Sequence, residues 1–238
     1  MNQMYALFFT FVETAIMKRF IILSAFSVCV AVLSCGFCCK DCRHDTLKHY
    51  SSATDVQSLI YVECTGGSNA VVTLYQKNEK GRWQEIFETD GYIGRNGLAS
   101  PEGTKREGDG KTPEGDIRVV SAFGIKDNPG TSIPYVKVDD DWWGCDEDCE
   151  YYNTIIKASE TGHQCKGEHL AHIAPAYNYS IVTSYNEKCE RGMGSLIFFH
   201  CIGTKPYTGG CVAVPEERMV EVLQRCDLHT VISIHPKN

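Results

Sequence analysis

Short runs of β-branched and aromatic residues recur from residue 58 to the end of the chain, and they limit its fold more than any other feature. Turn residues separate these runs, and residues 78–81 (Asn-Glu-Lys-Gly) are typical of a hairpin. The runs that we interpret as strands lie at 59–64, 70–77, 83–89, 116–122, 179–185, 195–201 and 230–234. Only 215–225 has amphipathic helical spacing, with acidic residues early and an arginine late. The pattern predicts a mainly β domain with one or two short helices.

Two stretches interrupt the strand pattern. Residues 91–115 are rich in glycine and charge, which favours an irregular loop, and we interpret its charged part at 105–111 as a solvated tip. The alternative for 105–111 is a charged rim beside a cleft. Residues 142–152 are acidic and aromatic, which predicts a surface excursion pinned by Cys145 and Cys149.

The amino-terminal segment has the composition of an export signal. Lys18 and Arg19 precede an uncharged apolar run at 20–33, which has signal-peptide length and is too short for a confident membrane span. We therefore predict that residues 1–34 are a signal peptide, with Met17 as the more natural start. The predicted location is periplasmic or envelope-anchored.

The residues after this run add a membrane attachment to the prediction. Cys35 directly follows an apolar stretch and Ser34, which resembles a lipoprotein cleavage box in which Cys35 is acylated. The alternatives are ordinary cleavage near Ser34 and an uncleaved signal anchor. We expect a polar tether at 35–57 and a folded domain at 58–238.

Thirteen cysteines are many for 238 residues. In an exported chain they suggest disulfides, and Cys145–Cys149 and Cys165–Cys189 are the local pairs that we predict. Eleven cysteines follow Cys35, so at least one of them stays unpaired within the chain or pairs between chains. Metal spacing is the competing interpretation for Cys35, Cys38, Cys39 and Cys42, but no second Cys/His pair lies at a convincing distance behind them, and the sequence predicts no metal site.

The charge of the chain argues against a nucleic-acid partner. The formal net charge is −7, and no cluster of Lys and Arg is present to neutralise phosphates. No glycine-rich phosphate loop opens a helix after a strand, so the sequence predicts no nucleotide or organic cofactor.

A histidine and a cysteine near the carboxyl end form the strongest candidate site. His200 ends an apolar strand, and Cys211 follows Gly209 and Gly210. A thiol needs a base to become a nucleophile, and His is the usual one. The glycines permit a close approach of substrate, and the N–H groups of Gly210 and Cys211 are candidate oxyanion donors. The alternative is structural: a strand-end histidine and a disulfide-bonded cysteine.

Several segments together resemble a known family. They are Asn96-Gly97-Leu98, KREGDGKTPEG at 105–115, Ala122-Phe123-Gly124, the pairs Tyr152-Asn153 and Tyr185-Asn186, and GSLIFFHCIGTKPYTGGCVAV at 194–214. In this order they resemble the catalytic domain of bacterial L,D-transpeptidases over residues 68–235. The resemblance is greatest to the YafK and ErfK branch, and it implies a YkuD-like domain, a β-sandwich or a barrel-like sheet.

The resemblance implies roles for individual residues. Cys211 corresponds to the acyl-accepting nucleophile, His200 to its general base, and Gly209 and Gly210 to the oxyanion turn. Four further residues in the matched segments are candidate substrate contacts: Thr208, Tyr185, Asn186 and Lys111. The stretch around Glu168 matches the family only loosely.

This chain departs from the family at two positions near the nucleophile. Most members have a histidine where this chain has Gly209, and an arginine where it has Ala213. The second departure removes a cation that would bind a carboxylate, so it puts substrate preference in question rather than acyl chemistry.

The implied reaction takes place on peptidoglycan stem peptides. The cysteine attacks the amide before the terminal D-alanine of a tetrapeptide stem, and an amine of a second stem resolves the thioester into a 3–3 cross-link. With water as acceptor the enzyme is an L,D-carboxypeptidase, and with an attached protein as leaving group it is a wall-protein-releasing hydrolase. The residues do not separate these three outcomes.

Two other classes remain open. One is a catalytically silent, disulfide-rich wall-binding protein, in which Cys211 is bonded to Cys201 or Cys226. The other is a zinc hydrolase, which is disfavoured because no H-E-x-x-H spacing occurs. Its candidate ligands are His163, His169, His172 and His200.

Overall fold

The strands form one large sheet that closes on itself in the computed structural model, which describes residues 42–146 and 148–237. Nine strands follow the order β11-β12-β13-β3-β2-β1-β14-β6-β7, and an additional pairing of β11 with β6 completes a barrel-like ring. Closure pairs strand edges that would otherwise be open to other chains. The nine strands are β1 (Ser58–Gly66), β2 (Asn69–Lys77), β3 (Trp83–Tyr92), β6 (Gly115–Gly124), β7 (Tyr135–Lys137), β11 (Ser180–Thr183), β12 (Phe198–Cys201), β13 (Val212–Val214) and β14 (Val231–Pro236). The mainly β prediction is confirmed.

Strand β6 makes the closure possible because it changes partner along its length. Its first half pairs with β14, and its second half pairs with β11. The side chains alternate along it, with Ile117 and Val119 buried in the core and Arg118 and Val120 exposed.

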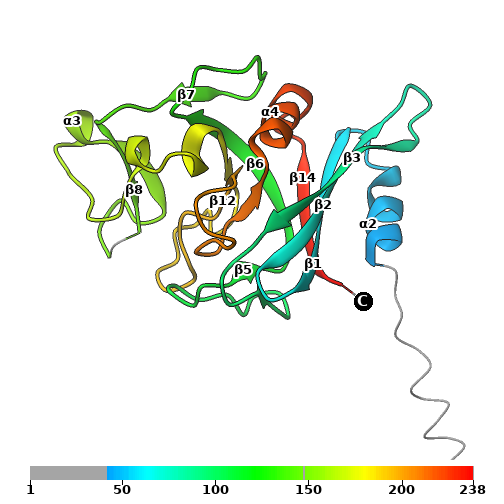
Figure 1. Cartoon of the computed structure of the whole chain (residues 1–238), viewed down its shortest axis with the longest axis horizontal. Coiled ribbons are helices and arrows are strands. Elements are labelled where there is room, and N and C mark those ends of the chain that lie inside the picture. Colours follow the sequence, from blue (N-terminus) through cyan, green and yellow to red (C-terminus); the bar gives the residue numbers. More distant parts are fainter. Residues whose placement is uncertain (1–41, 147, 238) are drawn as a thin grey trace, which may run out of the picture. The chain divides into compact units, whose positions relative to one another are not determined.

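The core fills the inside of this sheet and is capped by a helix. Strands β1, β2, β12 and β13 all contribute buried aliphatic or aromatic side chains to one cluster. Helix α4 (Glu216–Arg225) completes the cluster with Met219, Val222 and Leu223, whose side chains are fully buried. Figure 1 shows α4 beside β14 and β6. The helix predicted at 215–225 is confirmed.

A second helix, α2 (Cys42–Ser51), lies in the segment for which the sequence predicts a tether. The folded unit begins at Cys42 rather than at residue 58. Trp83 donates its indole N–H to the Leu47 carbonyl over 2.9 Å, and Tyr50 donates its hydroxyl to Asp116 over 2.7 Å. None of the helix residues is fully buried, so the segment lacks the apolar stripe by which a sequence pattern reveals a helix.

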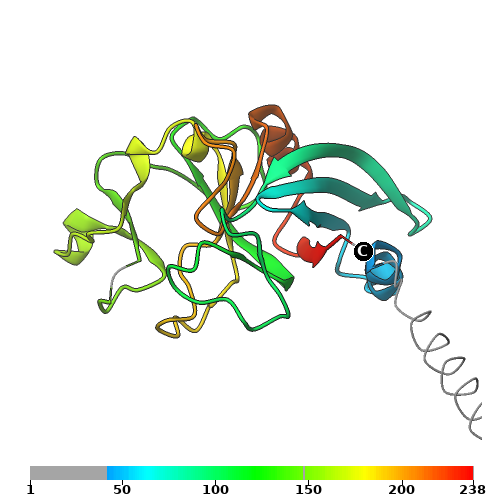
Figure 2. The same cartoon turned by 60° about the horizontal axis from the view of Figure 1, so that its bottom comes forward.

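The helix explains why both faces of β1 are apolar. Ile60 and Val62 point into the main core, whereas Leu59 and Tyr61 form a second cluster with Leu47 and Tyr50 of α2 and with the side chains of β2 and β3. Figures 1 and 2 both place α2 beside the part of the sheet that β1, β2 and β3 form.

The predicted signal peptide at 1–34, with Met17 and Cys35, lies outside the described residues. Among the residues that the structure describes, no helix combines the length and the apolar character needed to cross a membrane.

A small antiparallel sheet, here called the side sheet, lies away from α2 in Figures 1 and 2. It has the order β10-β8-β9. Its elements, with the short helices that follow them, are β8 (Trp142–Cys145), β9 (Thr154–Lys157), α3 (Ala158–Thr161), β10 (Glu168–His169) and the 3-10 turns η1 (Leu170–His172) and η2 (Ala176–Asn178). The excursion predicted at 142–152 is therefore part of a second, local sheet.

The cysteines of the side sheet pair differently from the prediction. Cys145 is bonded to Cys165, with the two Cα atoms 5.4 Å apart, and Cys149 and Cys189 are free thiols. The predicted pairs Cys145–Cys149 and Cys165–Cys189 are wrong. The reason is topological: β8 and the chain before β10 run side by side, which brings together cysteines 20 residues apart.

The glycine-rich stretch 91–115 is largely irregular, as predicted. Within it, β4 (Leu98–Ala99) and β5 (Thr112–Pro113) pair in parallel and hold the ends of the loop together. The strand predicted at 195–201 is shorter than expected, because Leu196 adopts a positive φ of 51° and β12 starts only at Phe198.

Candidate active site

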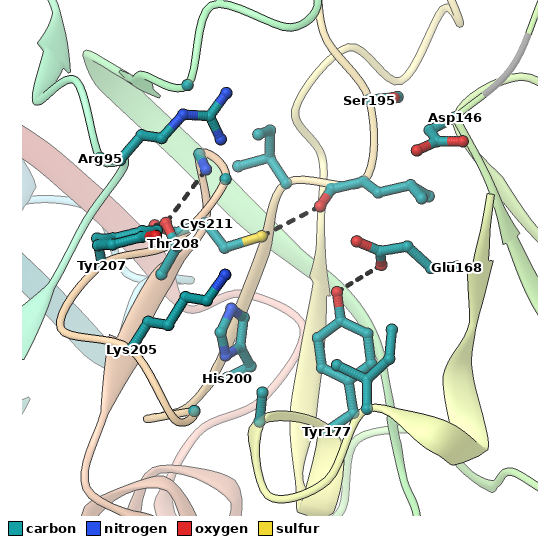
Figure 3. Close-up of a pocket in the computed structure, with 18 of the residues that line it drawn as sticks. Arg95, Asp146, Glu168, Tyr177, Ser195, His200, Lys205, Tyr207, Thr208 and Cys211 are labelled. Carbon is teal, nitrogen blue, oxygen red and sulfur yellow. Dashed lines mark hydrogen bonds between the residues drawn. The ribbon is translucent and has the colours of Figure 1, made fainter.

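Cys211 and His200 line the same pocket, between the barrel and the side sheet. His200 lies in β12, and Cys211 directly precedes β13, which pairs in parallel with β12. The loop between these strands returns to the same end of the sheet, so residues 11 apart in sequence face one cavity of about 330 Å³. Figure 3 shows the Cys211 sulfur near the middle of this pocket, with the His200 ring close by.

The sulfur of Cys211 is held by two backbone groups. It accepts a hydrogen bond from the Phe198 N–H and donates its own proton to the Leu196 carbonyl, each over 3.2 Å. Burial, with a smaller contribution from the charge of Glu168, raises the pKa of the thiol to about 12. Cys211 is therefore a protonated thiol in the resting pocket.

The ring of His200 is oriented to act as a base. Its Nδ1–H donates to the Cys201 carbonyl over 2.7 Å, which leaves the lone pair on Nε2. The edge of the ring meets Tyr177, with ring centroids 5.4 Å apart. Burial lowers the pKa of His200 to about 4, so the imidazole is neutral at pH 7. No hydrogen bond joins the ring to the Cys211 sulfur, and the resting pair is a thiol with a neutral imidazole.

Two threonines fix the turn before Cys211. Thr208 donates its hydroxyl to the Cys211 carbonyl over 2.7 Å, and Thr112 donates to the Gly210 carbonyl over 2.8 Å. The Gly210 N–H in turn donates to Oγ1 of Thr208 over 3.1 Å. Of the two N–H groups that the sequence suggests as oxyanion donors, the one of Gly210 thus already has a partner in the resting state.

The two glycines of this turn differ in what a side chain would meet. At Gly210, where φ is +156°, a Cβ atom would lie 2.9 Å from the Lys111 carbonyl oxygen and 3.0 Å from Ile197. At Gly209 nothing lies within 4 Å of the same position. The close approach of the 105–111 loop therefore requires glycine only at position 210.

The charged loop at 105–111 is part of the pocket and not a solvated tip. Lys105 is only 3% exposed, and its ammonium donates to Asp109 over 2.7 Å and to the Arg106 carbonyl over 2.6 Å. Asp109 also accepts the N–H groups of Arg106 and Lys111. Burial alone would raise the pKa of Asp109, but these donors together lower it below its ordinary value. The side chain of Lys111, a predicted substrate contact, does not line the pocket.

The predicted contacts Tyr185 and Asn186 also lie outside the pocket lining. Tyr185 donates its hydroxyl to the Met193 carbonyl over 2.7 Å, and Asn186 donates its amide to the Gly194 carbonyl over 2.8 Å. Asn153 donates to the Asn186 carbonyl and accepts the Leu196 N–H, each over 2.8 Å. The two Tyr-Asn pairs thus brace the loop whose Leu196 carbonyl contacts Cys211.

One wall of the pocket comes from the side sheet and was not predicted from the sequence. Tyr177 is buried and donates its hydroxyl to Glu168 over 2.5 Å. Burial is the main cause that raises the pKa of Glu168 to about 7, with a further contribution from Asp146. Only the loose family match around Glu168 pointed to this wall, because the side sheet has no motif that relates it to Cys211.

The opposite side of the pocket carries positive charge. In Figure 3 the side chains of Arg95 and Lys205 lie on one side of the Cys211 sulfur, and those of Asp146 and Glu168 lie on the other. Arg95 belongs to the irregular loop after β3, and no sequence pattern distinguishes it from other charged residues there.

The alternatives that remained open from the sequence involve other cysteines and histidines. Cys211, Cys201 and Cys226 are all free thiols, so no disulfide occupies the candidate nucleophile. The four histidines of the zinc-hydrolase alternative do not meet: His200 lies in the pocket, and His169 and His172 lie beside Asp140. His163 groups with cysteines of the side sheet.

A family model matches most of the chain. The family model described as the L,D-transpeptidase catalytic domain (YkuD) matches residues 68–234, which is most of the chain and includes every residue of the pocket. No curated protein and no solved structure gives a significant match.

Proposed function

Because the chain belongs to the L,D-transpeptidase catalytic-domain family, we propose that it is a cysteine acyltransferase that cross-links peptidoglycan tetrapeptide stems through a thioester on Cys211. The observation that carries this proposal is the shared pocket of Cys211 and His200. The hydrogen bond from Nδ1 of His200 to the Cys201 carbonyl leaves Nε2 as the proton acceptor.

The chemistry begins from a neutral pair. Sγ of Cys211 attacks the carbonyl carbon of the third stem residue while its proton passes to Nε2 of His200. Collapse of the tetrahedral intermediate breaks the amide bond, and His200 returns the proton to the amine of the departing D-alanine. The amine of a second stem then attacks the thioester, His200 takes up its proton, and the Cys211 thiol re-forms.

The raised pKa of Cys211 and the lowered pKa of His200 disfavour an ion pair before substrate binds. Proton transfer is therefore expected to accompany attack on the carbonyl rather than to precede it. Donors aimed at the developing oxyanion are then expected to provide most of the stabilisation, and the Cys211 N–H is our candidate donor.

The charge on the two sides of the pocket suits a stem peptide. A diamino acid carries an ammonium, which fits the side of Asp146 and Glu168, and the stem carries carboxylates, which fit the side of Arg95 and Lys205. Ala213, which stands where the family has arginine, is buried in β13. We propose that Arg95 takes over the carboxylate-binding role of the arginine that other members of the family have at this position.

The test is incubation of the chain with disaccharide-tetrapeptide muropeptides, followed by mass spectrometry of the products. We expect release of D-alanine and a new 3–3 dimer with the wild type and with Cys189→Ser, a control that alters a half-buried free thiol outside the pocket, and neither product with Cys211→Ala. Release of D-alanine without a dimer would replace the transpeptidase by a carboxypeptidase. Products from Cys211→Ala would refute the thioester.

We further propose that the chain acts in the cell envelope, attached by a lipid on Cys35. The composition of residues 1–35 supports this location, and peptidoglycan lies outside the cytoplasm. Incorporation of a labelled fatty acid into the wild type and its loss in Cys35→Ala is the expected result. Equal labelling of both would exclude Cys35 as the acceptor.

A further inference from the structure

Four side chains with metal-binding atoms converge at one end of the side sheet. They are Cys145, Cys149, His163 and Cys165, and their sulfur and ring-nitrogen atoms all lie within 4.8 Å of one another. Cys145 and Cys165 are buried, and the other two are half-buried. The group is separate from the pocket, since none of the four residues lines it.

A disulfide accounts for only half of this group. The Cys145–Cys165 bond uses two sulfurs and leaves the free thiol of Cys149 and the ring of His163 within the same 4.8 Å. A free thiol beside a disulfide is also positioned to attack it, so the pairing would be open to exchange. Three cysteines and one histidine are instead a common ligand set of a structural zinc site.

The distances fit this ligand set. A tetrahedral zinc ion with bonds of about 2.3 Å to three sulfurs and about 2.0 Å to one nitrogen separates its ligand atoms by about 3.5–3.8 Å. Atoms that lie within 4.8 Å of one another reach this geometry through small side-chain movements. The spacing in sequence, with Cys149 four residues after Cys145 and Cys165 two residues after His163, lets each half of the site come from one short segment.

The side sheet also needs a cross-link because it has little core of its own. Its cluster contains Ile156 as the one buried aliphatic side chain, and the other buried members are Cys145 and Cys165. Its strands have only two to four residues each. A unit that buries so little apolar surface is generally stabilised by a disulfide or a metal ion.

We propose that Cys145, Cys149, His163 and Cys165 bind one structural Zn²⁺ ion when their thiols are reduced. Binding releases one proton from each of the three thiols, and the neutral imidazole donates its lone pair, so the occupied site carries one net negative charge. The Cys145–Cys165 disulfide is the competing state of two of the same sulfurs.

The site would act on the pocket through its neighbours in sequence. Asp146 directly follows Cys145, and Glu168 lies three residues after Cys165, and both line the pocket beside Cys211. The metal therefore fixes the acidic wall of the pocket without contacting substrate. The ring of His163 also packs against Tyr151, with the ring centroids 5.2 Å apart.

The test measures zinc in the full chain, purified with its thiols kept reduced, by elemental analysis and native mass spectrometry. We expect one zinc ion per chain in the wild type and no stoichiometric zinc in Cys149→Ser or His163→Ala. Two controls should keep the ion: Cys189→Ser, which alters a free thiol outside the group, and His172→Ala, which alters the separate group of Asp140, His169 and His172.

A variant with an exchanged zinc ligand distinguishes the loss of that ligand from the unfolding of the chain. Cys149→His keeps a zinc-binding atom at this position, so we expect it to recover zinc while Cys149→Ser does not. A reduced wild type without zinc would overturn the proposal, as would zinc that is lost in His172→Ala but kept in Cys149→Ser. Zinc that survives in Cys149→Ser, Cys149→His and His163→Ala alike would also overturn it.

Discussion

At the scale of single residues, burial controls the chemistry of the pocket more than direct pairing does. Cys211 and His200 have opposite pKa shifts with the same first cause, removal from water, and both shifts favour the uncharged form. The neighbouring Glu168 is shifted in the same sense, towards its neutral acid. The resting pocket thus holds three titratable groups whose uncharged forms the fold prefers.

Glu168 makes the stability of the fold depend on pH. Its pKa is raised from 4.5 to about 7, so between these values the folded chain binds more protons than the unfolded chain. Its contribution to stability is therefore complete below pH 4.5 and is lost as the pH rises through about 7. We expect the free energy of unfolding of Glu168→Gln to decrease less than that of the wild type as the pH rises from 4.5 to 8. Urea unfolding at several pH values in this range measures the difference.

His200 titrates in the opposite direction in part of this range, because its lowered pKa destabilises the fold as the pH falls from 6.5 towards 4. The quantity to compare is therefore the difference between wild type and Glu168→Gln, in which the His200 contribution cancels. A difference that stays constant from pH 4.5 to 8 would contradict the assignment.

The two glycines before Cys211 provide a matched pair. Gly210→Ala places a methyl group 2.9 Å from the Lys111 carbonyl oxygen, whereas Gly209→Ala places one in open space. We expect Gly210→Ala to lower the free energy of unfolding by about 1–3 kcal/mol and Gly209→Ala to change it by less than about 0.5 kcal/mol. Denaturant unfolding of both variants checks this, and equal effects would mean that the 105–111 loop does not press on the turn.

At the scale of elements, α2 shows what a helix without an apolar stripe contributes. Its contacts come from partly buried side chains and from hydrogen bonds to Trp83 and Asp116, spread over strands β1, β2, β3, β6 and β14 of the barrel. The helix covers Leu59 and Tyr61 of β1, which would otherwise be exposed on the outer face of the sheet.

Removal of α2 should therefore destabilise the domain. We expect the free energy of unfolding of a chain that starts at residue 53 to be about 2–4 kcal/mol lower than that of a chain that starts at Cys42. The reason is that an apolar patch on β1 and β2 becomes exposed. Thermal or urea unfolding of the two chains measures the difference. Equal stabilities would support the polar tether that the composition of 35–57 suggests.

The sequence predicts most of the barrel because its strands carry their own signals. Alternation in 116–122 and helical spacing in 215–225 are local patterns, and both correspond to elements of the structure. Cys211, His200 and Thr208 could likewise be placed together, since His200 lies in β12 and the other two lie in the loop that leads to the adjacent β13. Local patterns do not reveal which distant part of the chain an element packs against.

The side sheet and the 105–111 loop illustrate this limit. Lys105 would be expected to be exposed because it is charged, yet it is buried, and its ammonium donates to Asp109 and to the Arg106 carbonyl. Tyr177 and Glu168 reach the pocket only because the side sheet folds back beside β12. Neither contact follows from hydrophobic periodicity, which reports burial in the main core alone.

At the scale of the whole molecule, the pocket is assembled from several separate parts of the chain. The barrel supplies Cys211 and His200, the loop after β3 supplies Arg95, the 105–111 loop supplies Lys105, and the side sheet supplies Glu168. Strand β12 of the closed barrel carries His200, and the other side chains named here lie on loops and on the side sheet. Stability of the side sheet and reactivity of Cys211 are therefore linked through the acidic wall.

The most direct test of the central claim is intact-protein mass spectrometry of the chain after brief reaction with a tetrapeptide stem. We predict an adduct with the mass of the stem lacking D-alanine, located on the peptide that contains Cys211. It should be present in Cys201→Ala, which alters a buried thiol outside the pocket, and absent in Cys211→Ala. An adduct on another residue, or release of D-alanine by Cys211→Ala, would contradict the account.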